Sequence, residues 1–188
     1  AMLVWCLLLP PVGAGQAPDL LAVMKAMARE KVGALMGFER ASRLDEYFKT
    51  GTLIDGRVSE QLIRNIFFPN ASLHDGAMVI RDGRVAAAGC VLPLSENHHL
   101  SADLGTRHRA GVGVSELTDA VVVIVSEETG TISVAVGGML KRHLAPQTLQ
   151  RLLTNELAPA EEEGKGKKVR LPGRWFKGKA GKDESNEK

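Results

Sequence analysis

The 188-residue sequence has few cysteines and no long hydrophobic run. Its two cysteines, Cys6 and Cys90, lack metal-site spacing, so they predict neither a zinc site nor a disulfide framework and favour a reducing compartment. The apolar run MLVWCLLL at residues 2–9 is shorter than the roughly 20 residues that a membrane-spanning helix needs. It also lacks the basic start of a signal peptide. A G-x-x-x-x-G-K-[S/T] phosphate-binding loop is absent from the sequence as well.

Charge is distributed unevenly along the chain. Nine of the 24 Lys and Arg residues lie in residues 161–188, which leaves the preceding part near neutral. We therefore expect no nucleic-acid-binding face on the folded part. Residues 158–188 form a charged tail that we expect to be disordered. Residues 1–18 form an apolar segment, either the stump of a membrane anchor or a short packed helix.

Helices and strands alternate along the intervening residues 19–157, which we expect to form a single domain. Apolar spacing and capping residues predict helices at 19–33, 42–48, 59–68 and 146–157, with Ser42 and Ser59 as caps. Short apolar runs predict strands at 33–38, 77–80, 84–92, 120–125 and 131–136. Because Asp82-Gly83 and residues 127–130 would close hairpins, we expect an α/β fold with a mixed, twisted central sheet flanked by helices.

The segment LHDGA at residues 73–77 is the first candidate site. Asp-Gly is a common turn pair, and it also occurs at Asp55 and Asp82, so the pair alone indicates little. Asp75-Gly76 differs because it lies between a helix end and a buried strand. That position places a carboxylate at the mouth of the sheet, although a simple loop turn is the alternative.

The segment GTRHRA at residues 105–110 is the second candidate. Two arginines and a histidine can neutralise a polyphosphate, and arginine can do so through paired hydrogen bonds. Thr106 is a candidate helix N-cap, and a helix after it would add free amides to an anion site. Gly111 and Gly113 weaken that helix, and a solvated basic patch is the alternative.

The acidic segment SEETG at residues 126–130 is the third candidate. It can be an acidic hairpin turn, or one glutamate can supply an oxygen ligand for Mg²⁺ or Mn²⁺ that bridges to phosphates. The adjacent His98 and His99 would point apart on a regular element, so they make a poor metal pair.

Taken together, LHDGA, GTRHRA and VSEETG resemble the diadenylate cyclase domain family in their order and spacing. The likeness covers roughly residues 20–157 and includes VGAL at 32–35, Thr50-Gly51 and FPN at 68–70. It is strongest to the membrane-anchored subtype, whose catalytic domain follows transmembrane helices. The resemblance thus implies a cytoplasmic catalytic domain that is tethered to the membrane in the full-length protein.

The resemblance also implies an activity and a set of site residues. The enzyme would condense two ATP molecules into cyclic di-AMP plus two pyrophosphates at a face-to-face homodimer. Asp75 would help activate the ribose 3′-hydroxyl, and His74 and Glu128 would hold Mg²⁺ or Mn²⁺. The residues implied to bind the nucleotide are Gly76, Ala77, Leu92, Thr106, Arg107, His108, Arg109 and Ser126.

Two other functions fit parts of the sequence. A sensor could bind ATP or cyclic di-AMP without turnover, but it would not need the carboxylate of Asp75. A membrane or nucleic-acid binder could act through the basic tail, which contains Trp175-Phe176 beside Arg174 and Lys177.

Overall fold

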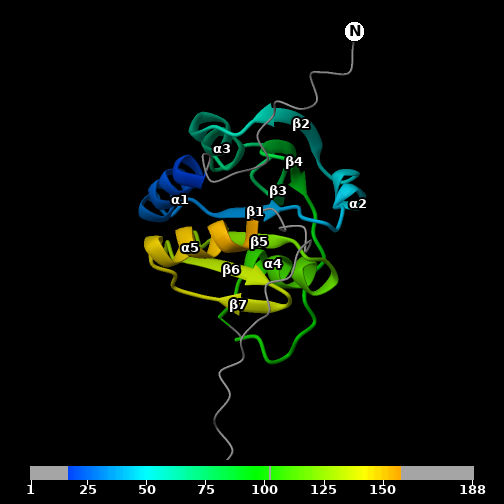
Figure 1. Cartoon of the computed structure of the whole chain (residues 1–188), viewed down its shortest axis with the longest axis vertical. Coiled ribbons are helices and arrows are strands. Elements are labelled where there is room, and N and C mark those ends of the chain that lie inside the picture. The colour runs from blue at the N-terminus through cyan, green and yellow to red at the C-terminus, as the bar shows by residue number, and fades with distance from the viewer. Residues whose placement is uncertain (1–16, 102, 158–188) are drawn as a thin grey trace, which may run out of the picture.

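Hydrophobic strands form the middle of a mixed sheet in the computed structural model, which describes residues 17–101 and 103–157. Within these residues, the sheet has seven strands in the order β2-β4-β3-β1-β5-β6-β7 (Figure 1). The strands are β1 Ala34–Phe38, β2 Thr52–Arg57, β3 Ala77–Arg81, β4 Arg84–Cys90, β5 Val121–Val125, β6 Ile132–Val136 and β7 Met139–Lys141. The helices are α1 Ala17–Glu30, α2 Asp45–Phe48, α3 Glu60–Ile66, α4 Thr106–Leu117 and α5 Pro146–Leu157.

Two hydrophobic layers cover the two faces of this sheet. Helices α1, α3 and α5 lie on one face, and α2 and α4 lie on the other (Figure 1). Strand β5 shows the division, because Val121, Val123 and Val125 face the first layer whereas Val122 and Ile124 face the second. A strand that is buried on both faces needs a continuous apolar run, which explains its sequence VVVIV.

The expected fold class is confirmed, and the five predicted strands are present with small shifts at their ends. The sequence patterns do not predict strands β2 and β7. Asp55-Gly56 suggests a turn within β2, but the pairing register of β2 with β4 shifts between Leu53 and Gly56 and Asp55 has a positive φ of 47°. The Asp-Gly pair here therefore accommodates a bulge inside a strand.

Helix caps are predicted less well than helices. Ser59 caps α3, where its side chain accepts a hydrogen bond from the Leu62 amide, as predicted. The prediction for Ser42 is wrong: α2 begins after Leu44, and the Ser42 amide donates to the Asp119 carboxylate. Thr106 is likewise the first residue of α4 rather than its cap, because Gly105 occupies the extended cap position.

The directions of the strands bring many strand ends to one edge of the sheet. Strand β1 runs parallel to β3 and antiparallel to β5, and β6 and β7 continue the antiparallel pairing. The first residues of β1, β3 and β6 therefore lie at the same edge as the last residues of β4, β5 and β7. We call this the β3-start edge, and the candidate site lies along it.

No helix in residues 17–101 and 103–157 is long and apolar enough to cross a membrane. The run at residues 2–9, Cys6 and the basic tail lie outside the described residues. Their predicted roles therefore stay predictions. Residues 17 and 18, which the sequence pattern assigns to the apolar segment, belong to α1.

Helix α4 continues through Gly111 and Gly113 despite their low helix propensity. A Cβ on Gly113 would lie 2.2 Å from the Pro93 carbonyl oxygen and 2.7 Å from the Ser95 amide nitrogen. The Ser95 amide also donates to the Arg109 carbonyl on the same helix. The glycine therefore lets α4 contact the backbone of residues 93–95 directly.

We expect Gly113→Ala to lower the free energy of unfolding by roughly 1–3 kcal/mol, because overpacking against backbone outweighs the gain in helix propensity. Urea denaturation measures the change. Gly37→Ala is the matched control, since the nearest atoms to its Cβ would be 4.0 Å away. A Gly113→Ala protein as stable as the parent would show that α4 and residues 93–95 are not rigidly packed.

Candidate functional site

A cavity of about 870 Å³ lies along the β3-start edge. Strand ends bring segments that are distant in sequence to its walls. Of the predicted site residues, the cavity is lined by His74, Asp75, Gly76, Leu92, Thr106, Arg107, His108, Ser126 and Glu128. The three predicted motifs thus meet in one place.

The loop before β3 presents Asp75 as an exposed side chain on the cavity wall. The next residue, Gly76, has φ of +113°, and a Cβ there would lie 2.7 Å from the Gly89 carbonyl carbon. Only glycine allows this backbone conformation at so close an approach to β4. The Nδ1 of the preceding His74 lies 2.6 Å from the Ala71 carbonyl oxygen, so Nδ1 carries a proton that it donates there, and in the neutral tautomer Nε2 is the acceptor.

Arg107 extends from the first turn of α4 into the same cavity. Its Nη1 donates to the Glu127 carboxylate at 2.8 Å. Its Nε is buried and has no hydrogen-bond partner among the residues that the structure describes. Gly33 lies against this pair, because a Cβ there would be 2.8 Å from Glu127 Oε2. A buried donor without a partner is costly to the fold, and because this Nε is not solvent-accessible, a molecule in the cavity would contact Arg107 through its Nη atoms.

His108 is buried on α4, with Nε2 3.4 Å from the Ser133 hydroxyl of β6. Burial lowers the pKa of His108 below its ordinary value, and the positive charge of Arg142 lowers it further. The carboxylates of Asp103 and Glu128 act in the opposite direction. Because burial dominates, the imidazole is neutral near pH 7, where it can donate or accept a hydrogen bond but does not supply positive charge.

Two of the predicted nucleotide-binding residues do not line the cavity. Ala77 is fully buried in β3. Arg109 lies two residues beyond Arg107 on α4, and two residues turn a helix by about 200°, so its side chain leaves on a different side. Neither residue therefore lies on the cavity wall of this chain, and their nucleotide-binding roles stay predictions.

Sequence reasoning missed several residues that line the cavity, including Asp103 and Arg142. Asp103 and Arg142 form an ion pair at 2.8 Å between the segment before α4 and the end of β7. They are 39 positions apart and belong to no motif, so no local signal in the sequence connects them. Only the position of β7 at the end of the sheet brings them together.

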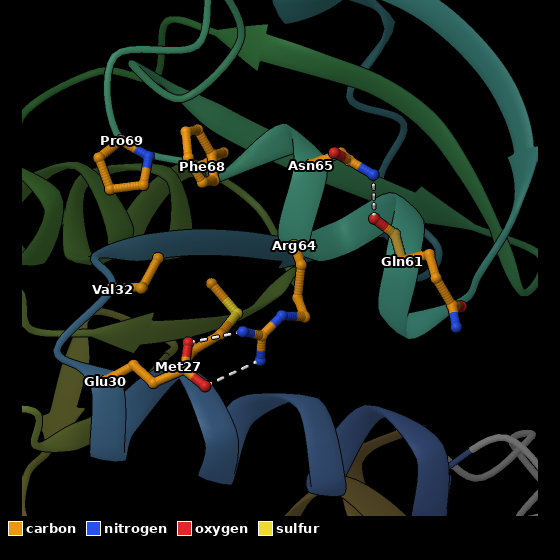
Figure 2. A pocket seen from close by; sticks show the side chains of 8 residues that line it. All are labelled: Met27, Glu30, Val32, Gln61, Arg64, Asn65, Phe68 and Pro69. Atoms are coloured by element: carbon orange, nitrogen blue, oxygen red, sulfur yellow. Dashed lines mark hydrogen bonds and ion pairs between the residues drawn. The ribbon is translucent and has the colours of Figure 1, made fainter.

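A second, smaller cavity of about 370 Å³ lies between α1 and α3. Its charged side chains are paired: Arg64 binds Glu30 through two hydrogen bonds, and the Asn65 side-chain amide donates to the Gln61 backbone carbonyl (Figure 2). Met27, Val32, Phe68 and Pro69 supply apolar walls. Because Arg64 and Glu30 bind each other, this cavity is a weaker candidate for a functional site than the cavity at the β3-start edge.

A protein-only metal cage is absent from the part of the chain that the structure describes, since no three His, Cys, Asp or Glu side chains cluster suitably. His74 and Glu128 nevertheless both line the large cavity. The proton on His74 Nδ1 leaves Nε2 as a possible ligand. The donor set therefore fits a cation that takes its remaining ligands from phosphates and water.

The fold and the cavity define a mixed α/β domain with a cavity at one sheet edge that is lined by two arginines and four carboxylates. A family model described as DisA bacterial checkpoint controller nucleotide-binding, or DAC, matches residues 22–140. The chain belongs to this family, which confirms the resemblance to diadenylate cyclase domains.

Curated relatives agree with this membership. The chain is 46% identical over 149 residues to the cyclic di-AMP synthase CdaA of Bacillus subtilis, covering 78% of this chain and 55% of the relative. It is 42% identical over 154 residues to the diadenylate cyclase of Listeria monocytogenes, with 82% and 55% covered. The chain thus spans about half the length of these relatives.

Two solved structures are similar in fold. The crystal structure of a double mutant of DacA from Staphylococcus aureus matches with a TM-score of 0.75 and 43% identity, covering 76% of this chain and 95% of that one. A hypothetical membrane spanning protein from Bacillus cereus matches with a TM-score of 0.67 and 34% identity, covering 70% and 64%.

We expect acidification below about pH 6.5 to destabilise the protein through His108. An unfolded histidine binds its proton near pH 6.5, whereas burial delays protonation of His108 in the folded state to lower pH. The unfolded state therefore holds more protons in this window, and the free energy of unfolding falls as pH falls, by at most about 1.4 kcal/mol per pH unit. Well above pH 6.5 the histidine is neutral in both states, so His108 no longer makes the free energy of unfolding depend on pH.

Urea denaturation between pH 7.5 and pH 5 measures this dependence. His108→Gln should have a flatter profile than the parent, because glutamine can contact Ser133 without titrating. His98→Gln, at an exposed loop position, controls for the loss of an imidazole. Parallel profiles for the parent and His108→Gln would show that His108 does not cause the loss of stability at low pH.

Proposed function

We propose that this chain is the catalytic domain of a diadenylate cyclase, which joins two ATP molecules into cyclic di-AMP and releases two pyrophosphates. The observation that carries the proposal is the convergence of Asp75, Arg107 and Glu128 on one cavity. Family membership and the names of the relatives support it. We assign the catalytic domain to residues 19–157.

The reaction is a nucleotidyl transfer, in which a ribose 3′-oxygen attacks the α-phosphorus of the other ATP and pyrophosphate leaves. Asp75 would accept or orient the proton of that hydroxyl, since its carboxylate is exposed on the cavity wall. Arg107 would donate to phosphate oxygens through its guanidinium Nη atoms, since its side chain lines the cavity. Leu92 would contact the base, and Thr106, His108 and Ser126 would supply neutral hydrogen bonds.

Electrostatics support a requirement for Mg²⁺ or Mn²⁺. Four carboxylates and two arginines line the cavity, so its formal charge is −2 when the histidines are neutral. A triphosphate would be repelled from such a site without a cation. His74 and Glu128 would hold the ion, which would neutralise charge on the phosphates.

A homodimer is part of the proposal, because the residues that the structure describes place the single Asp75 on one cavity, whereas the product needs two phosphodiester bonds. A two-fold axis would place the 3′-hydroxyl of each ATP against the α-phosphorus of the other. Both subunits would then use the same residues. Val91 and Leu94 support a contact at the mouth, since both line the cavity and are 64% and 53% exposed. Membrane tethering of the full-length protein at its N-terminal side, with this domain in the cytoplasm, completes the proposal.

We expect Asp75→Asn to abolish cyclic di-AMP formation while ATP binding survives, because the amide keeps the shape but loses the proton acceptor. Incubation with ATP and Mg²⁺ or Mn²⁺, followed by mass spectrometry, measures the product, and calorimetry measures binding. Asp82→Asn, in the Asp-Gly turn between β3 and β4, is the matched control and should remain active. Product at the parent rate from Asp75→Asn would remove Asp75 from catalysis.

The same assay separates an enzyme from a sensor. If the parent protein binds ATP but forms no product with either metal at any protein concentration, then the domain is a sensor and the cyclase proposal fails.

Activity per subunit should rise with protein concentration, because the reaction needs two cavities. A dilution series over about two orders of magnitude tests this, with product per subunit as the readout. ATP affinity per subunit, measured over the same range, is the control and should change little. Constant specific activity across the series would argue against catalysis in a transient dimer.

A further inference from the structure

Arg142 is a second arginine in the large cavity, and no motif in the sequence points to it. It follows β7, the last strand of the sheet, and its Nη2 donates to Asp103 Oδ2 at 2.8 Å. Both residues line the same cavity as Arg107. Arg142 also acts on that site electrostatically, since its charge lowers the pKa of His108.

The order of the strands fixes where Arg142 lies relative to Asp75. Asp75 precedes β3 and Arg142 follows β7, with β1, β5 and β6 between them. Strands lie about 4.8 Å apart, so these two ends of the cavity are separated by roughly 19 Å. Arg107 and Glu127 lie between the two ends, beside the start of β1 and the end of β5.

This order matches the order of groups along a nucleotide. With the ribose and α-phosphorus at Asp75 and the next cation at Arg107, the triphosphate extends towards Arg142. We propose that Arg142 binds the phosphates beyond the α-phosphate, and therefore the departing pyrophosphate. This inference rests on the proposed cyclase function.

Asp103 positions Arg142 without blocking it. Hydrogen bonds from Ser101 and Arg142 lower the pKa of Asp103 to about 2, so the carboxylate stays charged at neutral pH. The pair is exposed, with side chains 34% and 59% accessible, and such pairs shift an equilibrium roughly fivefold at most. A phosphate can offer Arg142 two parallel charge-assisted hydrogen bonds, so exchange of Asp103 for phosphate is favourable.

The charge balance favours a second arginine on the phosphates, beside the proposed divalent cation. With four carboxylates in the lining, Arg107 alone would leave a triphosphate facing an excess of negative charge. Arg142 is the other arginine that lines the cavity in the part of the chain that the structure describes. At the far end of the cavity, Arg142 places its positive charge beside the leaving group, where negative charge grows in the transition state.

Calorimetry on the full chain with Mg²⁺ tests the inference, using an ATP analogue with a methylene bridge between the α- and β-phosphorus atoms. This analogue cannot release pyrophosphate, so turnover does not disturb the measurement. We expect Arg142→Ala to bind it roughly tenfold to a hundredfold more weakly than the parent, as expected for a lost charge-assisted contact. Affinity for AMP should not fall by the same factor, and Arg142→Lys should recover part of the loss.

Lys141→Ala is the matched control, because it removes one positive charge from the same strand end and does not line the cavity. It should bind the analogue as the parent does. Thermal melts confirm folding, and Arg142→Gln replaces Arg142→Ala if the alanine variant is unfolded.

The outcomes separate the two proposals. If the parent binds the analogue and Arg142→Ala matches Lys141→Ala, the role of Arg142 is overturned while the cyclase proposal stands. An equal loss for AMP and the analogue would also overturn it, since the effect would then be a general change in the pocket. If the parent itself fails to bind the analogue, the nucleotide site as a whole is wrong.

Discussion

The parallel pairing of β1 with β3, next to the antiparallel pairing of β1 with β5, is the constraint on which the site depends. Together with the antiparallel pairing of the remaining strands, it brings one end of each of the seven strands to the β3-start edge. If β1 ran in the opposite direction, Gly33 would lie at the far edge from Asp75 and Glu127. The burial of β5 on both faces stabilises this arrangement, because a central strand with no polar face has no other place in the fold.

Close backbone contacts then set the shape of the cavity. Gly76 lets the loop that bears Asp75 approach β4, and Gly113 lets α4 contact residues 93–95. These contacts fix two walls of the cavity relative to each other without using side chains. Because backbone atoms make these contacts, side chains on the same segments, such as that of Asp75, can face the cavity. A mostly apolar fold can therefore carry polar groups at this site.

Paired charges hold both cavity arginines before any ligand arrives. Glu127 binds Arg107 and Asp103 binds Arg142, each at 2.8 Å. Because both carboxylates are exposed, these pairs orient the guanidinium groups but compete weakly with a phosphate. His108, which lines the same cavity, is buried and neutral near pH 7, so the two arginines supply the positive charge of the lining.

The sequence by itself determined the fold class, because apolar runs such as VVVIV and turns such as Asp82-Gly83 act locally. It also indicated the three motifs around Asp75, Arg107 and Glu128, since their residues are adjacent in the chain. Only the tertiary structure decided that Arg142 joins them and that Arg109 does not. Strand order and helical rotation set those positions, and both arise from packing between segments that are far apart in the sequence.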